Sequence, residues 1–300
     1  MPDPTYSDTS RIVITLSSLI ERFLTDLRNA NRSAHTLRAY AADLSQLSAF
    51  CTDDLATVDA DMLRAFFASG AHLSPTSRAR KQASLASFFN WACRQDLINV
   101  SPMLRIERVK LELPLPRGLS AEQISTILAV IPSAHKRDRL LFRLLVETGL
   151  RISEALHLYV EDVDLTTDNE RLLIHGKGGR QRSILLDDPQ LLRQLKAYLT
   201  TTGYHHGPLF RAEKNGRGAT LSYQAVQKRW TGYCVQAGIA CSLHQLRHSH
   251  ATALINGGVS ITTIRKRLGH KNLQTTLRYA EQTDTAADAE LRAWRRKRSR

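Results

Sequence analysis

The sequence predicts a mainly α protein: an all-helical N-terminal domain, then a mixed α+β domain that is mostly helical with a small antiparallel sheet. The chain has 300 residues, more than one compact core usually holds, so two domains are expected. Apolar residues recur at helical spacing before residue 105, and no convincing strand appears there. Beyond residue 118, two alternating segments interrupt an otherwise helical pattern, at 171–175 and 180–186.

The first domain, placed at residues 12–105, is expected to hold four helices. The apolar periodicity predicts them over 16–27, 36–50, 62–67 and 75–91. Pro75 follows Ser74 at the start of the last helix, where the missing N–H of proline costs little. Basic side chains lie between the apolar residues of this helix, at Arg78, Arg80 and Lys81. We predict that these three, like Arg105, Arg108 and Lys110 in the segment that follows, contact nucleic acid.

Residues 106–117 are predicted to connect the two domains. The stretch around them is basic and aperiodic, with Arg105, Arg108 and Lys110 followed by Pro114 and Pro116. Two prolines so spaced favour an extended segment that cannot join a helix. The segment is either a connector that lies along a nucleic-acid backbone or a plain linker, and the sequence favours neither.

The second domain, placed at residues 118–285, begins at a capping box. Ser120 and Gln123 have the spacing in which each side chain binds the other residue's backbone N–H. A strongly apolar helix should end at Thr148-Gly149, and Ser153 is a plausible cap for the next one. The Gly-rich stretch 176–179 joins the two predicted strands as a hairpin. Further helices are expected over 191–199, 223–235, 246–255 and 261–268, before a basic tail at 286–300.

The composition points to a polyanionic partner. The chain carries 42 Lys and Arg against 28 Asp and Glu, a formal net charge of +14, and nucleic acid is the commonest partner of so basic a protein. Its four cysteines are scattered without a close pair, which favours a reducing compartment over a disulfide framework. The first ten residues lack the order of a secretory signal, and no apolar run reaches about 18 residues. We therefore expect a cytoplasmic protein without a membrane span.

Two arginines stand in otherwise apolar helical stretches, where a charge is costly unless it has a function. These are Arg151 and Arg247. Attack on a phosphodiester builds negative charge on its two non-bridging oxygens, and the planar guanidinium suits that charge. Glu154 follows Arg151 by three residues and is close enough to orient it. The pair of arginines predicts a phosphate-binding site.

Four further residues could complete a phosphoryl-transfer site. Lys177, in the Gly-rich turn, could protonate a leaving alkoxide. Tyr279 is a weak nucleophile at its ordinary pKa of about 10, and it needs nearby cations and a histidine to react. His244, which shares a helical face with Arg247, and His270 are the candidates. Singly, each has a plain structural interpretation, and their joint placement favours chemistry.

A group of cysteines and histidines that includes His244 could instead bind zinc. Cys234, Cys241, His244 and His248 offer suitable ligand types, but six residues separate the two cysteines. Structural zinc sites favour cysteines about two to four residues apart. We therefore predict no metal site and no cofactor.

The ordered blocks resemble the tyrosine recombinases of the phage integrase or Xer type. The likeness rests on residues 150–156 and 176–180, on His244-x-x-Arg247-His248, on 268–270 and on Tyr279. It is strong over 118–285, as a catalytic domain, and looser over 12–105, which is similar to the family's SAM-like core-binding domain. The blocks are specific together, although each alone is weak.

The resemblance implies a role for each candidate. Arg151 and Arg247 would hold the scissile phosphate of a DNA strand. Tyr279 would attack it to form a 3′-phosphotyrosine, and Lys177 would protonate the leaving 5′-oxygen. His244 would assist proton transfer, His270 would hydrogen-bond the phosphate, and Glu154 would be the supporting carboxylate.

The family also implies partners. These are double-stranded DNA with specific recombination sites and a homotetramer that works through a Holliday junction, with or without a partner recombinase or accessory protein. Neither metal nor ATP would be needed. The sequence leaves open whether the reaction is chromosome dimer resolution, integration or excision of a phage or other element, or transposon resolution. Two rival functions remain: relaxation of DNA by a type IB topoisomerase, and non-catalytic binding by an architectural protein.

Overall fold

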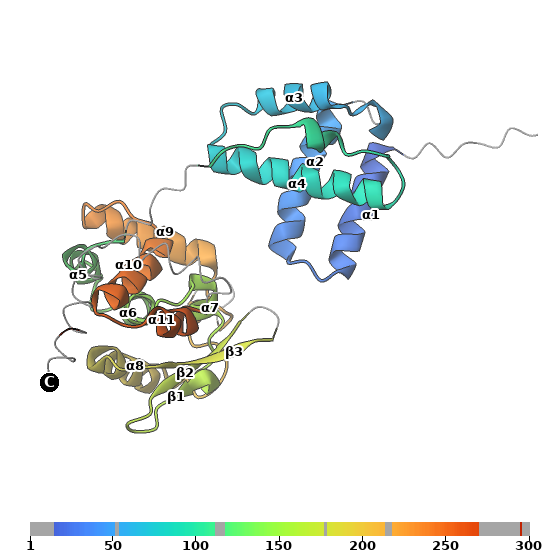
Figure 1. Cartoon of the computed structure of the whole chain (residues 1–300). Helices are drawn as coiled ribbons and strands as arrows, with labels where there is room; N and C mark the ends of the chain where they lie inside the picture. Colours follow the sequence, from blue (N-terminus) through green and yellow to red (C-terminus); the bar gives the residue numbers. More distant parts are fainter. Residues whose placement is uncertain are drawn as a thin grey trace, which may run out of the picture. The chain divides into compact units, whose positions relative to one another are not determined.

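The computed structural model describes residues 15–51, 54–111, 118–176, 179–213, 218–269 and 295. Contacts divide the chain into two compact units, Met1–Leu113 and Pro114–Arg300. Both are mainly helical, and the second holds a three-stranded antiparallel sheet (Figure 1). The predicted fold class is confirmed. None of the helices in the described ranges is long and apolar enough to cross a membrane.

The described part of the N-terminal unit is all-helical. Its elements are α1 (Leu16–Asn29), α2 (Ala34–Phe50), η1 (Leu55–Thr57), α3 (Ala60–Ser69), α4 (Pro75–Arg94) and η2 (Pro102–Arg105). α1, α2 and α4 pack on one another around an aromatic core, in which the rings of Phe23 and Phe88 meet edge to face at 5.5 Å. Pro75 is the first residue of α4, as its place after Ser74 predicted.

The C-terminal unit packs helices against its sheet, whose outer face is exposed at Leu173 and Leu185. They are α5 (Ala121–Ala129), α6 (Lys136–Thr148), α7 (Ile152–Leu156), η3 (Val160–Asp162), α8 (Pro189–Thr202), α9 (Tyr223–Gln236), α10 (Leu243–Asn256) and α11 (Ile261–Leu268). α6 packs against both α8 and α10, and α11 packs against α10 and the sheet (Figure 1). The capping box at Ser120 and Gln123 starts α5 as predicted.

The sheet runs β1 (Val163–Asp164), β2 (Arg171–His175) and β3 (Gln181–Leu185), in that order. The predicted hairpin forms, with Leu172 paired to Ile184 and Ile174 to Arg182. Those apolar side chains are buried, so this face of the hairpin turns to the core. β1 was not predicted because two residues are too few to show an alternation.

Two helices beside the candidate site, α7 and α10, begin earlier than predicted. α7 starts at Ile152 with Arg151 as its N-cap residue, and Ser153, which we expected to be the cap, lies inside the helix. The Glu154 carboxylate supplies the cap instead, because it accepts the Arg151 backbone N–H at 2.9 Å. α10 starts at Leu243, three residues before the predicted start, since a capping box joins Ser242 to Gln245. His244 therefore lies in the first turn of α10.

Candidate active site

Arg247 is buried at the centre of the C-terminal unit. Its side chain comes from α10 and is 2% exposed. One end of the guanidinium donates from Nη1 to the Gly149 carbonyl at 2.7 Å, and Nη2 donates to the Leu268 carbonyl at 2.7 Å. Both of these bonds go to neutral carbonyls, and they fix the orientation of the guanidinium. Such a cation is suited to binding an anion.

Gly149 makes this arrangement possible. It ends α6 at φ +63°, in the left-handed region, as the predicted stop at Thr148-Gly149 required. A Cβ there would lie 2.6 Å from His250 Cδ2 and 2.7 Å from Leu268 Cδ2. Glycine is therefore needed both for the turn and for the close packing that brings the carbonyl to Arg247.

Arg151 is held at the start of α7 by Glu154. Its Nη1 lies 3.0 Å from Glu154 Oε1, and its side chain is 42% exposed where that of Glu154 is 10%. Burial by itself would raise the pKa of the Glu154 carboxyl, but hydrogen bonds from the Arg182 side chain and the Arg151 backbone outweigh it. The pKa is lowered, so Glu154 stays a carboxylate and orients Arg151 for contact with solvent or ligand.

Arg182 is a site residue that the sequence analysis missed. It donates Nη1 and Nη2 to the two oxygens of Glu154 at 3.0 and 2.9 Å, and Nε to the Arg267 carbonyl at 3.0 Å. One side chain thus joins β3, α7 and the end of α11. A signal existed: Arg182 has the same register as the buried Ile184, so a charge stands on the inward face of the hairpin.

His244 is close enough to both arginines to sense their charge. Burial, followed by the charges of Arg247 and Arg151, lowers the pKa of its imidazole below the ordinary value. The ring also meets His248 edge to face, with centroids 4.4 Å apart. At neutral pH His244 is therefore uncharged and able to accept a proton.

A large cavity opens beside Arg151, Glu154 and Arg182. Its volume is about 1180 Å³, and residues of α7, the hairpin and α11 line it, Arg151 and Glu154 among them. Gly176 and Arg180, which flank the Gly-rich turn, also lie on its wall. Arg247 and His244 do not line this cavity, but Arg247 binds the Gly149 carbonyl, two residues before Arg151, and the charges of both arginines act on His244. Three predicted site residues, Lys177, His270 and Tyr279, lie outside the described residues.

The basic residues predicted on α4 have differing surroundings. Arg80 is half-exposed and forms an ion pair with the buried Asp43, with Nη2 2.9 Å from Oδ1. Lys81 is only 8% exposed, because Nζ donates to Gln46 Oε1 at 2.6 Å and lies over the Phe66 ring. Arg78 is half-buried. These contacts give Arg80 and Lys81 a role in holding α4 to its neighbours.

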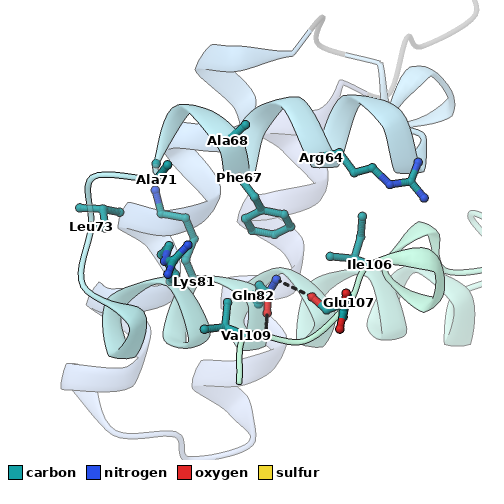
Figure 2. A pocket seen from close by; sticks show the side chains of 12 residues that line it. Arg64, Phe67, Ala68, Ala71, Leu73, Lys81, Gln82, Ile106, Glu107 and Val109 are labelled. Carbon is teal, nitrogen blue, oxygen red and sulfur yellow. Dashed lines mark hydrogen bonds between the residues drawn. The ribbon is translucent and has the colours of Figure 1, made fainter. Parts of the chain in front are cut away.

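The start of the predicted linker packs against the N-terminal unit. Gln82 donates to the Glu107 carbonyl at 3.0 Å and accepts from the Val109 N–H at 2.9 Å. Figure 2 shows these two bonds at the edge of a pocket of about 430 Å³ that Phe67 and Lys81 also line. The neighbouring basic side chains are all exposed: Arg105, Arg108 and Lys110.

Two cysteines are closer than the sequence suggested. We expected no close pair, but the Sγ atoms of Cys234 and Cys241 lie 3.3 Å apart, as free thiols. Burial, with the contact to Cys241, raises the pKa of Cys234 to about 12, so this thiol stays protonated. Among the described residues, no group of three His, Cys, Asp or Glu side chains could hold a metal ion.

Comparison with known proteins identifies the class. The profile of the phage integrase family matches residues 117–286, and that of the phage integrase N-terminal SAM-like domain matches residues 20–96. The first match includes every candidate catalytic residue. The chain belongs to the phage integrase family and is a site-specific tyrosine recombinase.

Named relatives agree over most of the chain. Tyrosine recombinase XerC of Rhodospirillum centenum is 35% identical over a 271-residue alignment covering 83% of this chain and 78% of the relative. That of Myxococcus xanthus is 31% identical over 295 residues, covering 90% and 94%. Among solved structures, the XerH site-specific recombinase bound to palindromic difH substrate in a post-cleavage complex is 25% identical. It matches with a TM-score of 0.74, covering 93% of this chain and 85% of that one.

A second solved structure shares the fold. A lambda integrase dimer bound to a COC′ core site matches with a TM-score of 0.73 at 19% identity, covering 88% of this chain and 77% of that one.

Proposed function

We propose that this recombinase binds duplex DNA at a specific site, cuts a strand by forming a 3′-phosphotyrosine at Tyr279, and rejoins it to another strand through a Holliday junction. One observation carries the proposal: Arg151, at the start of α7, lies close enough to His244 for its charge to act on that ring, as does Arg247, and both His244 and Arg247 come from the first two turns of α10. Two guanidinium groups beside a neutral imidazole are what attack on a phosphodiester requires.

The cleavage step follows from the chemistry of these groups. The phenolic oxygen of Tyr279 attacks the phosphorus, and its proton passes to His244. Arg151 and Arg247 bind the non-bridging oxygens as charge builds on them, with His270 as a further hydrogen-bond donor. The bond from phosphorus to the 5′-oxygen breaks, and Lys177 gives that oxygen a proton.

Rejoining is the reverse reaction with a new nucleophile. The 5′-hydroxyl of a partner strand attacks the phosphotyrosine, its proton returns to the lysine, and the tyrosine leaves and regains a proton. The phosphodiester energy is kept in the protein–DNA ester, so the cycle consumes no ATP. The arginines supply the charge that a metal ion would otherwise provide.

The remaining parts of the chain have proposed roles in DNA binding and assembly. Residues 12–105 would form the core-binding domain and 118–285 the catalytic domain, which together hold the duplex. Arg105, Arg108 and Lys110 would bind phosphates, because they are exposed on the connector. Lys81 is left out because it is buried. The lambda integrase tetramer bound to a Holliday junction supports a homotetramer, with residues 286–300 as a docking tail, working on DNA in the cytoplasm.

A nicked suicide duplex tests the proposal. The duplex should carry DNA that flanks the gene, so that a candidate recombination site is present. Wild-type protein should form a covalent adduct that survives denaturation, and Tyr279→Phe should form none while still binding the duplex. An adduct that persists in Tyr279→Phe would contradict the assignment. Relaxation of a plasmid without any such site would favour a topoisomerase.

A further inference from the structure

α11 has an apolar face in the core and a polar face on the large cavity. Ile264 and Leu268 are fully buried against α10. Thr262, Arg265 and Lys266 line the cavity, together with Gly269 just past the end of the helix. The spacing of i, i+3, i+4 and i+7 puts these four positions on one side of the helix. The polar face of α11 is therefore one wall of the candidate site.

The charge of this cavity is far from balanced. Five cationic residues line it, against one carboxylate, that of Glu154. Arg151 and Arg182 share that carboxylate. The other three cations, Arg180, Arg265 and Lys266, form no ion pair with any carboxylate in the described part of the chain. All three are exposed, so their side chains can reach a ligand.

The size of the cavity also exceeds what a single phosphate needs. Pockets of roughly 300–1,000 Å³ enclose most of a drug-sized molecule, and this one measures about 1180 Å³. A single phosphodiester against Arg151 would leave the α11 wall without a partner. A DNA strand brings a further phosphate with each nucleotide, so it can contact both walls at once.

We propose that Arg265 and Lys266 of α11, with Arg180 of the hairpin, form a second phosphate-binding subsite for a backbone phosphate close to the scissile one. The inference rests on the proposed function and names a further DNA contact within the same cavity. The subsite reads no base, because the contacts are to the backbone. It positions the strand so that the scissile phosphate meets Arg151 and Arg247.

The salt dependence of DNA binding tests the subsite. The protein carries Tyr279→Phe throughout, so that binding to a fluorescent duplex of arbitrary sequence is reversible and measured by anisotropy. Each lost phosphate contact should flatten the slope of log Kobs against log salt by about 0.9. Arg265→Gln with Lys266→Gln should therefore reduce the slope by about 1.8, whereas Arg265→Lys should keep the parent slope because the charge is retained.

Arg193→Gln is the matched control, since it removes one charge from the exposed side of α8, outside the cavity. It should leave the slope unchanged. An unchanged slope in the double variant, with helical content preserved by circular dichroism, would overturn the subsite and leave the proposed function standing. A flattening by about 0.9 in Arg193→Gln, the amount expected for one lost contact, would also overturn it, because net charge alone would then explain the effect. A parent protein without salt-dependent duplex binding would overturn both proposals.

Discussion

The two ends of α6 both lie beside buried arginines, and they hold them in opposite ways. At the start of the helix, Asp138 is 1% exposed and accepts from Arg137, from Arg229 Nη1 at 2.7 Å and from the Tyr233 hydroxyl at 2.7 Å. At the end of the helix, the carbonyl of Gly149 accepts from Arg247.

The difference lies in the partner of the cation. At the start of α6, the Asp138 carboxylate neutralises the guanidinium, so that charge is balanced inside the domain. At the other end, two neutral carbonyls fix the orientation of the Arg247 guanidinium. Burial alone therefore does not identify a functional arginine; the chemical type of its partner does.

The largest effect on stability is expected at the start of α6, where Asp138 neutralises the arginine. Asp138→Ala should lower the free energy of unfolding by about 3 kcal/mol, because it leaves the 6%-exposed Arg137 without its buried carboxylate partner. Urea denaturation would measure this. Glu213→Gln is the matched control, because Glu213 also meets Arg137 but is 67% exposed, and it should cost less than about 1 kcal/mol. Equal costs for the two variants would contradict the comparison.

At the end of α6, where Gly149 holds Arg247, a substitution should affect DNA cleavage. Arg247→Lys keeps a positive charge but loses the planar fork, so single-turnover cleavage should fall by about 10²- to 10³-fold while duplex binding stays close to wild type. The suicide-duplex assay would measure cleavage, and anisotropy would measure binding. A parallel loss of binding would show that Arg247 holds DNA rather than the reacting phosphate.

His250, which packs against Gly149 at the end of α6, should make the stability of the fold depend on pH in the acidic range. Burial, with the charge of Arg267, lowers the pKa of His250 to about 4, and the Arg267 Nε donates to its Nε2 at 3.2 Å. The unfolded chain has a pKa of about 6.5 there, so it binds the proton more readily below that pH. The stabilisation, about 3 kcal/mol, is complete above pH 6.5 and is lost as the pH falls towards 4.

Denaturation of wild type and His250→Gln at several pH values would measure this contribution. The variant should show a flatter dependence between pH 6.5 and 4. His157→Gln, which changes an exposed histidine, should follow wild type. Parallel curves for wild type and His250→Gln would refute the assignment.

The smallest effect is expected at Arg182. Arg182→Lys cannot serve both oxygens of Glu154 and the Arg267 carbonyl, so Arg151 should be less well oriented. We expect cleavage to slow by about 10-fold at saturating DNA, corresponding to about 1.4 kcal/mol. Arg171→Lys, on the same hairpin, should react at the wild-type rate. A loss seen only in DNA affinity would argue against a positioning role.

Local patterns identified much of the site. Arg151 and Glu154, like His244 and Arg247, are three residues apart, so the sequence alone predicted that each pair lies within one helical turn. The end of an apolar helical pattern predicted the helix stop at Gly149. The bond from Arg182 to Glu154 crosses 28 positions and depends on how the hairpin packs against α7. No local periodicity encodes that packing.

Basic residues in a helical pattern were harder to interpret. Lys81 lies on α4 between apolar residues, and the same spacing fits a lysine that faces DNA or one whose long stem packs inward. In the structure the Lys81 side chain packs inward, because its ammonium group donates to Gln46 Oε1 and lies over the Phe66 ring. Likewise, Cys234 and Cys241 meet only because α9 ends and α10 begins close together.

Two arginine side chains hold the end of α11 in place. Arg182 of β3 donates to the Arg267 carbonyl, and Arg247 of α10 donates to the Leu268 carbonyl. Ten residue steps separate Gly269 from Tyr279, and a chain of that length spans at most about 35 Å. The anchored helix end is thus a fixed tether point. It defines a radius of about 35 Å within which the tyrosine must meet its phosphate, whether in its own subunit or in a neighbour.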